Sequence, residues 1–242
     1  MHTPRQAGAN VSVELYAPGL QWYVDKLRNG QRFSFARYGN GEWDCILNLY
    51  HRTRSGSQRF TPDLREALTK SLTVARGETY YPALQSVSYL ERLGLLPKAE
   101  AWCKEQGLDP TWHDGEVFTR ASRAGTLYPL IEALRMQRVV VVGPRWLMKL
   151  PFASVFIPVQ TRDCWTQVDA LEEQLRGLQN VVVSFSAGPA AKVLIHRLAP
   201  VIGKHSWLID FGSLWDPFCG VKSRTYHKRL TPELLRRNLE GK

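Results

Sequence analysis

Short apolar runs of strand length recur along the chain, and they are rich in β-branched or aromatic residues. They are Phe33–Ala36, Val139–Val142, Val181–Phe185 and Trp207–Phe211, with Ala153–Val159 as a weaker fifth candidate. The last four in chain order alternate with helical patterns, such as Leu171–Leu178 and Ala190–Leu198. This alternation predicts βαβ units and hence an α/β fold, with an open, mainly parallel sheet flanked by helices.

The segments between and around these runs are predicted to be helical or irregular. Residues 1–20 show no sustained period, so an irregular lead-in is expected before a short helix at Leu20–Leu27. The section 61–136 is mostly helical by pattern and would form a helical insertion in the middle of the fold. A Thr-Pro-Glu sequence beginning at Thr231 predicts a C-terminal helix within 229–242. Without repeats or a low-complexity linker, the 242 residues are expected to form one domain.

A glycine-containing turn follows the first predicted strand, in the sequence FARYGNGE that ends at Glu42. Gly39 and Gly41, on either side of Asn40, allow a tight turn and a close approach of the backbone to a ligand. Arg37 can pair with a phosphate group. Ligands of open parallel sheets bind beyond the carboxyl ends of the strands, so this turn is a candidate site. The alternative is a plain strand-to-helix turn in which Asn40 or Glu42 caps the helix.

Two later strands also end in turns that can bind a ligand. Ser186-Ala187-Gly188 follows Val181–Phe185 and precedes a helix, whose free amide groups and dipole suit a diphosphate. The turn lacks the Gly-Lys-Ser ending of a Walker loop, and a tight connection with Pro189 in the first turn of the helix is the alternative.

The third turn places two carboxylates, Asp210 and Asp216, near the end of the last predicted strand. Aromatic side chains close by could stack on a base or a sugar, and cationic or titratable groups follow directly. The alternative is a turn that begins at Asp216-Pro217, with Trp215 packed into the core.

Composition adds a hint about partners. The formal net charge of +10 attracts polyanions, although scattered solvated lysines and arginines give the same sum. No apolar run approaches the length of a membrane span, and the first residues lack the apolar core of a signal peptide, so a cytoplasmic protein is expected, in the host cytoplasm if the chain is phage-encoded. The cysteines lack the paired spacing of a zinc or redox site and are expected to be buried thiols; they are Cys45, Cys103, Cys164 and Cys219.

Together, the three turns resemble the GT-D fold glycosyltransferases over the span from Phe33 to His227. Those enzymes share an Arg-aromatic-Gly-Asp-Gly-Glu turn after an early strand, a later small-residue turn, and an Asp-x-Gly sequence, here Asp210-Phe211-Gly212. The resemblance implies a Rossmann-like fold and hexosyltransferase-like transfer from a nucleotide sugar such as a UDP-sugar.

The resemblance also implies a divalent cation, Mn or Mg, held at the donor diphosphate by the two acidic residues of the early turn. Here Glu42 takes the second acidic place and Asn40 the first, so these two residues are the expected metal ligands. An amide brings no negative charge, so weaker metal binding, or none, is expected.

Roles follow for the residues of the three turns and their surroundings. The expected catalytic residues are Glu42, Asp210 and Asp216, with Asp210 or Asp216 as the base. The expected donor-binding residues are Arg37, Tyr38, Gly39, Asn40, Gly41, Ser186, Ala187, Gly188, Lys192 and Arg224. Residues expected to bind the acceptor or to play a secondary role are His113, Asp114, Trp215, Tyr226, His227, Lys228 and Arg229.

The acceptor is open between two classes. One is a sugar or glycan on a lipid or protein; the other is a hydroxylated base in DNA, as in phage-type DNA modification, which the positive charge slightly favours. A base drawn out of the duplex could stack on Trp43, Trp112 or Trp215. A nucleotide- or nucleic-acid-binding module without turnover is a further alternative, supported by Asn40 in an acidic position.

Overall fold

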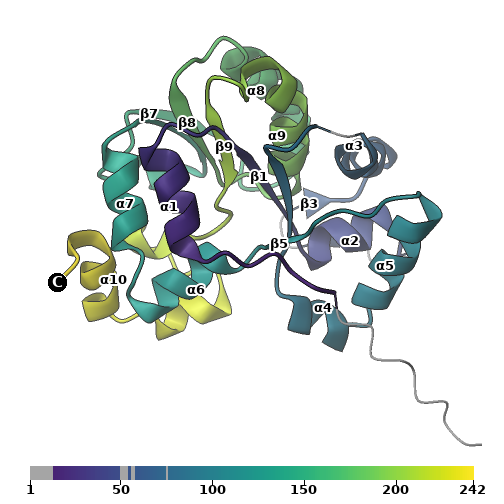
Figure 1. Cartoon of the computed structure of the whole chain (residues 1–242), viewed down its shortest axis with the longest axis horizontal. Coiled ribbons are helices and arrows are strands. Elements are labelled where there is room, and N and C mark those ends of the chain that lie inside the picture. The colour runs from purple at the N-terminus through teal and green to yellow at the C-terminus, as the bar shows by residue number, and fades with distance from the viewer. Residues whose placement is uncertain (1–12, 50–53, 56–57, 75) are drawn as a thin grey trace, which may run out of the picture.

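A seven-stranded sheet crosses the part of the chain that the structure describes, with strand order β5-β4-β1-β9-β8-β6-β7 (Figure 1). The structure is a computed structural model and describes residues 13–49, 54–55, 58–74 and 76–242. Neighbouring strands of the sheet are parallel throughout, which confirms the predicted fold class. The strands are β1 (Ser34–Tyr38), β4 (Tyr80–Leu84), β5 (His113–Asp114), β6 (Arg138–Gly143), β7 (Val155–Pro158), β8 (Val181–Phe185) and β9 (Trp207–Asp210). A separate antiparallel hairpin is formed by β2 (Arg54–Ser55) and β3 (Gln58–Arg59).

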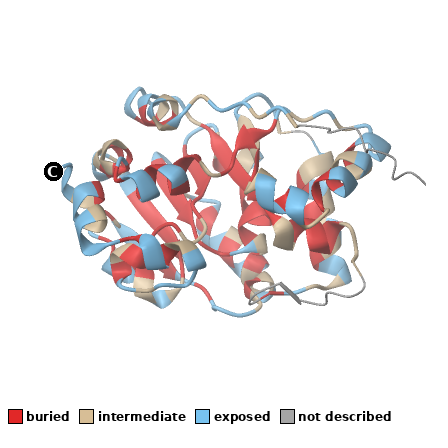
Figure 2. Cartoon of the chain, turned by 90° about the horizontal axis from the view of Figure 1, so that it is seen from below, coloured by how far each residue is buried: buried red, intermediate tan, exposed pale blue. Residues whose placement is uncertain are grey.

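Helices cover both faces of the sheet, and the strands are buried between them (Figure 2). One apolar cluster joins the sheet to α1, α6 and α7, and the other joins it to α2, α3, α5, α8 and α9. The α-helices are α1 (Leu20–Arg28), α2 (Asn40–Ile46), α3 (Pro62–Thr73), α4 (Val87–Arg92), α5 (Leu96–Glu105), α6 (Val117–Ala124), α7 (Tyr128–Arg135), α8 (Val168–Leu175), α9 (Pro189–Ile202) and α10 (Pro232–Glu240). Short 3-10 helices lie in the connections, namely η1 (Arg145–Lys149), η2 (Cys164–Gln167), η3 (Asp216–Cys219) and η4 (Thr225–Arg229). Burial on both faces explains why β6 and β8 are almost continuous runs of valine.

Five of the strands lie at the predicted runs, but β4 and β5 fall inside the section predicted to be mostly helical. β4 contains Pro82, which is rare in a strand because it cannot donate a ladder hydrogen bond. β5 pairs only with Ala83 and Leu84, so Pro82 lies where the outer edge of β4 is free of β5. β5 itself is two residues long, too short for a periodic pattern.

Helix α9 begins beside the carboxyl ends of the central strands and packs across them. It packs against β1 and β9 and also contacts α3 and α8. Most of its residues are buried, and the small residues Ala190 and Ala191 lie in its first turn, directly after Pro189. Its first turn therefore lies close to the carboxyl ends of β8, β9 and β1, where the polar turns of the chain meet.

Other expectations can be compared with the described residues. The predicted lead-in falls partly on 1–12, outside the described residues, and α1 begins at Leu20 as expected. The C-terminal helix is confirmed as α10, capped by the Thr231 hydroxyl. All four cysteines are free and buried, as predicted. Among the described helices, none combines the length and the apolar character that crossing a bilayer requires.

Candidate functional site

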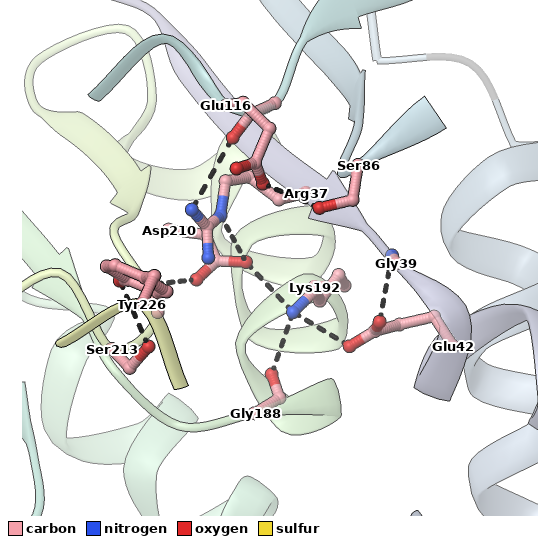
Figure 3. Close-up of polar contacts among 12 residues, drawn as sticks. Arg37, Gly39, Glu42, Ser86, Glu116, Gly188, Lys192, Asp210, Ser213 and Tyr226 are labelled. Atoms are coloured by element: carbon pink, nitrogen blue, oxygen red, sulfur yellow. Dashed lines mark hydrogen bonds and ion pairs between the residues drawn. The ribbon is translucent and has the colours of Figure 1, made fainter. Parts of the chain in front are cut away.

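Four charged side chains lie together at the carboxyl ends of β1 and β9 (Figure 3). Arg37 comes from β1, Glu42 from α2, Lys192 from α9 and Asp210 from β9. The Lys192 Nζ atom lies 2.9 Å from Glu42 Oε1 and 2.9 Å from Asp210 Oδ2. Arg37 Nε lies 3.9 Å from the same Asp210 oxygen. None of the four side chains is more than 8% exposed, so two cations and two anions share one buried cluster. We call these four residues the charge quartet.

The polar atoms of the quartet also have backbone partners that fix their positions. Glu42 Oε2 accepts a 3.0 Å hydrogen bond from the Gly39 amide and thereby caps α2, the helix-capping role considered for this residue. Asp210 Oδ1 accepts from the Gly212 amide at 2.9 Å. Lys192 donates to the Gly188 carbonyl at 3.1 Å, so its ammonium has three protein partners.

The electrostatics of the quartet keep Lys192 charged. Burial lowers the pKa of the ammonium, but the adjacent carboxylates of Asp210 and Glu42 outweigh that effect and raise the pKa above its ordinary value. The quartet sums to zero charge, which is the condition under which buried ions are tolerated. Lys192 is therefore a fixed positive charge at the functional edge.

Two glycines make room for this arrangement. A Cβ atom on Gly212 would lie 2.1 Å from Nη2 of Arg37, and the backbone of Gly212 has a φ of +56°. A Cβ on Gly115 would lie 2.5 Å from the Leu84 carbonyl oxygen. The Gly115 carbonyl in turn accepts a 3.5 Å hydrogen bond from Arg37. The guanidinium therefore lies between the turns that follow β5 and β9.

The start of α9 lies beside the quartet and is the turn predicted to bind a diphosphate. Gly188 has a φ of +57° and is exposed, and Pro189 occupies the first helical position as predicted. The first turn of a helix leaves amide groups without intrahelical partners, and the helix dipole adds positive potential. The buried Oγ atom of Ser186 has no hydrogen-bond partner among the described residues. The start of α9 therefore combines amide donors with a buried hydroxyl that has no protein partner among the described residues.

The ends of β4 and β5 contribute two residues that the sequence reasoning missed, Ser86 and Glu116. Ser86 adopts a left-handed conformation with φ of +54°, and its hydroxyl donates to Glu116 Oε1 at 3.1 Å. The Glu116 side chain is half-buried. The signal was present in the sequence, because Asp114-Gly115-Glu116 is an Asp-Gly-Glu turn like that of the resemblance. Left-handed backbone in a serine is strained, and such strain clusters at functional sites.

Asp114 and Asp216 are both buried and fully engaged by other groups. Asp114 accepts from the Glu116 amide at 2.9 Å and from Arg120 at 2.7 Å. Asp216 accepts from the Trp146 indole at 2.8 Å and from the Ser223 hydroxyl. Each carboxylate therefore has both oxygens committed within the protein.

The segment after Asp216 carries both buried and exposed predicted residues. Burial lowers the pKa of His227, and its Nδ1 accepts from the Arg224 amide at 3.2 Å. Burial raises the pKa of Tyr226, whose hydroxyl lies 3.5 Å from Ser213 Oγ. The exposed basic residues of this segment are Lys222, Arg224, Lys228 and Arg229.

Several predicted residues point into the core. Tyr38 packs toward α3, with its hydroxyl 2.9 Å from Ser71 Oγ. The His113 Nδ1 atom forms a 2.7 Å hydrogen bond with the Tyr23 hydroxyl. Burial, followed by the charge of nearby Lys26, lowers the pKa of His113 to about 4. The tryptophans considered as stacking surfaces, Trp43, Trp112 and Trp215, are all buried. Asn40 and Gly41 are half-buried in the first turn of α2.

The quartet does not fit a divalent cation as it stands. Glu42 has one oxygen on the Gly39 amide and the other on Lys192, and the ammonium already lies between Glu42 and Asp210. Across the part of the chain that the structure describes, no three acidic, histidine or cysteine side chains converge in a way that could hold a metal ion. A cation at Glu42 would first have to displace Lys192.

Among the described residues, two of the cavities flank the central sheet. One of about 630 Å³ lies beyond the carboxyl ends of β6 and β7 and is lined by Trp146, Arg145 and the segment 158–162. A larger one of about 760 Å³ lies beside the amino end of β4, lined by aromatic residues that include Tyr81 and Trp112. Only the first lies on the edge that carries the charge quartet.

Comparison with solved structures gives three matches. The first, "A New Glycosyltransferase (DUF1792) from Streptococcus sanguinis", shares 18% sequence identity, covers 94% of each chain and has a TM-score of 0.64. "The highly conserved domain of unknown function 1792 has a distinct glycosyltransferase fold" shares 16% identity over 94% of this chain and 91% of that one, with a TM-score of 0.61. A selenomethionine-substituted structure of the same domain covers 85% of this chain at 16% identity, with a TM-score of 0.61.

This chain has the fold of those glycosyltransferases. The resemblance seen in the three turns is thereby confirmed at the level of fold, over nearly the whole chain. No protein-family model matches the sequence, and no curated protein matches it.

Proposed function

We propose that this protein is a glycosyltransferase that moves a sugar from a nucleoside-diphosphate sugar to a hydroxyl acceptor. The observation that carries the proposal is the charge quartet beside the open first turn of α9, on the ligand-binding edge of a sheet with this fold. Transfer needs a place that stabilises the departing diphosphate, and a helix N-terminus with fixed cations nearby provides it.

The order of the strands suggests how the donor lies along the edge. Neighbouring strands are about 4.8 Å apart, so the four gaps from β6 to β4 span roughly 19 Å. We place the nucleoside in the cavity beside Trp146, where an indole can stack, and the diphosphate over Gly188 at the start of α9. The sugar then lies over the ends of β9 and β1, between the diphosphate and the half-buried Glu116.

The fixed cations act on the leaving group. As the bond between the anomeric carbon and the diphosphate oxygen breaks, its electrons leave with the diphosphate and negative charge grows there. Arg37 is held by Asp210 and by the Gly115 carbonyl, and Lys192 by its three partners. Dipoles and charges that are already oriented stabilise such charge without reorganisation.

We assign the base to Glu116 in preference to Asp210 or Asp216. A base must reach the acceptor hydroxyl, and the carboxylates of Asp210 and Asp216 are buried with both oxygens engaged. Glu116 is half-buried, and Ser86 orients it through one oxygen. In the step proposed, the acceptor oxygen bonds to the anomeric carbon while its proton passes to Glu116.

For the acceptor, the exposed cations beyond η3 favour a polyanion, and we propose a hydroxylated base in DNA as the first candidate. The cations are Lys222, Arg224, Lys228 and Arg229. A glycan or lipid-linked sugar is the second candidate. If the acceptor is DNA, the logarithm of the binding constant should fall by about 0.9 for each log unit of salt concentration and each phosphate contacted. The double variant Lys228→Ala, Arg229→Ala should reduce that slope by the contribution of up to about two phosphate contacts. A slope near zero in the parent protein would assign the acceptor to the glycan class.

Thermal unfolding with a panel of nucleotide sugars tests the donor. A ligand that binds only the folded state raises the melting temperature by mass action. We expect one or more nucleoside-diphosphate sugars to raise it, and the matching nucleoside monophosphate to raise it less, because it lacks the second phosphate. Stabilisation by none of the panel would contradict the proposed function.

A further inference from the structure

We propose that the ammonium of Lys192 takes the place of a divalent cation at the donor site, so that this protein binds a nucleoside diphosphate without a metal ion. The inference rests on the proposed function for the identity of the ligand. Its structural basis is the position of one lysine between Glu42 and Asp210, at 2.9 Å from each carboxylate.

The position between the two carboxylates is already occupied by Lys192. A divalent cation prefers carboxylate oxygens, and the two carboxylates of the charge quartet both bind Lys192. Their remaining oxygens accept from the amides of Gly39 and Gly212. A metal ion could enter only after Lys192 had left, and an expelled ammonium would lose three partners in a region where it is almost fully buried.

The neutral amide of Asn40 matches the charge balance of the quartet. The quartet contains two positive and two negative groups, so it is neutral as it stands. A carboxylate at position 40, on the same helical turn as Glu42, would bring the acidic groups to three against two cations. A divalent ion would correct such an excess, whereas the neutral amide of Asn40 needs no correction. Asn40 and Lys192 are thus two parts of one arrangement.

Lys192 lies one turn into α9, and its side chain folds back to the carbonyl of Gly188, the residue that begins the anion-binding turn. Its charge is therefore held directly beneath the position assigned to the diphosphate. With all three ammonium hydrogens engaged, Lys192 acts as a positioned charge rather than as a direct ligand of the phosphate.

The binding experiment uses the full chain with UDP, GDP and dTDP as probes, each in EDTA and in MnCl2. We expect the diphosphate that binds to have the same Kd in both buffers. Lys192→Arg, which keeps the positive charge, should bind without metal as well. A wild-type Kd that weakens about fivefold or more in EDTA, the low end of typical coupling between two ligands, would overturn the proposal.

A second measurement follows Mn²⁺ alone by electron paramagnetic resonance and does not depend on the donor. Wild type should leave the ion free, because Lys192 occupies the position between Glu42 and Asp210 and the amide of Asn40 adds no negative charge. The double variant Asn40→Asp, Lys192→Ala should bind it, since three carboxylates then share Arg37 as their one remaining cation in the quartet. Mn²⁺ bound by wild type and released by Glu42→Gln would overturn the role of Lys192, even if the double variant does not fold. If no diphosphate binds, the proposed function fails, and the Mn²⁺ measurement still decides the role of Lys192.

Discussion

A methyl group on Gly212 would lie 2.1 Å from Nη2 of Arg37, so the turn after β9 and the guanidinium of β1 can coexist only because position 212 has no side chain. The same turn donates its Gly212 amide to Asp210, which pairs with Arg37. One glycine thus fixes the spacing between two members of the charge quartet.

Gly212→Ala should displace Arg37 and weaken diphosphate binding. The expected loss of stability combines about 1–2 kcal/mol for left-handed backbone with about 1–3 kcal/mol for overpacking. Gly220→Ala is a matched control, because Gly220 also has a positive φ, of +82°, but nothing lies within 4 Å of its added Cβ. Chemical denaturation and UDP binding would measure both effects. Equal behaviour of the two variants would show that Arg37 does not depend on the space at Gly212.

Lys192→Ala should leave Glu42 and Asp210 as buried carboxylates without their shared cation. Breaking a buried ion pair by removing one partner costs about 3–5 kcal/mol. The exposed Lys98 on α5 offers a control, and Lys98→Ala should change the free energy of unfolding by no more than about 0.5 kcal/mol. Urea denaturation compares the two. A Lys192 variant as stable as the control would mean that the quartet contributes little to folding.

Glu116→Gln should lower kcat for sugar transfer by about 10²- to 10⁴-fold, the usual contribution of a general base. Donor binding should be unchanged, because Glu116 lies at the end of β5, away from the turn assigned to the diphosphate. Ser86→Ala should lower kcat less, since it removes only the hydroxyl that orients the carboxylate. Glu91→Gln, at an exposed glutamate of α4, is the control. Full turnover by a folded Glu116→Gln protein would remove this residue from the mechanism.

The stability of the protein should fall as the pH is lowered from about 6.5 toward 4. His196 Nε2 lies 3.2 Å from the Val74 carbonyl oxygen, and His196 Nδ1 lies 3.3 Å from Nη2 of Arg76. A neutral ring that carries its proton on Nε2 satisfies both contacts, because Nε2 then donates to the carbonyl and Nδ1 accepts from Arg76. Burial, followed by the nearby Arg76, lowers the pKa of His196 to about 4 from 6.5. Between these values the unfolded chain takes up a proton that the folded protein refuses, so acidification favours unfolding.

Melting temperatures across this range provide the measurement. His196→Gln should lose less stability on acidification than the parent does, because one of the responsible groups is gone. His205→Gln, at an exposed histidine, should follow the parent. Parallel curves for all three proteins would show that His196 does not contribute to the acid response.

The sheet was largely predictable because burial on both faces leaves unbroken valine runs in β6 and β8, and helices separate them at regular spacing. Strand β4 was not predictable, because a proline such as Pro82 is compatible with a strand only where the edge beside it is unpaired. Whether that edge is unpaired depends on where β5 lies in the fold.

For the candidate site, the sequence indicated the three turns, whose small and charged residues directly follow strands. It did not indicate that Lys192 would lie between Glu42 and Asp210, since these residues are 150 and 18 positions away and meet only through the packing of α9 on β1 and β9. Glu116 was also missed, because the section around it was expected to be helical.

The most direct test of the central claim is turnover of the donor. Wild-type protein would be incubated with nucleotide sugars, with and without hydroxymethylated DNA or a glycan acceptor, and release of the nucleoside diphosphate would be followed by mass spectrometry. Activation of the donor at the charge quartet predicts slow release from at least one nucleotide sugar without acceptor, and faster release with incorporation of the sugar when the right acceptor is present. Nucleotide binding by a folded protein, with neither hydrolysis nor transfer from any donor, would contradict the account and assign the chain to binding without catalysis.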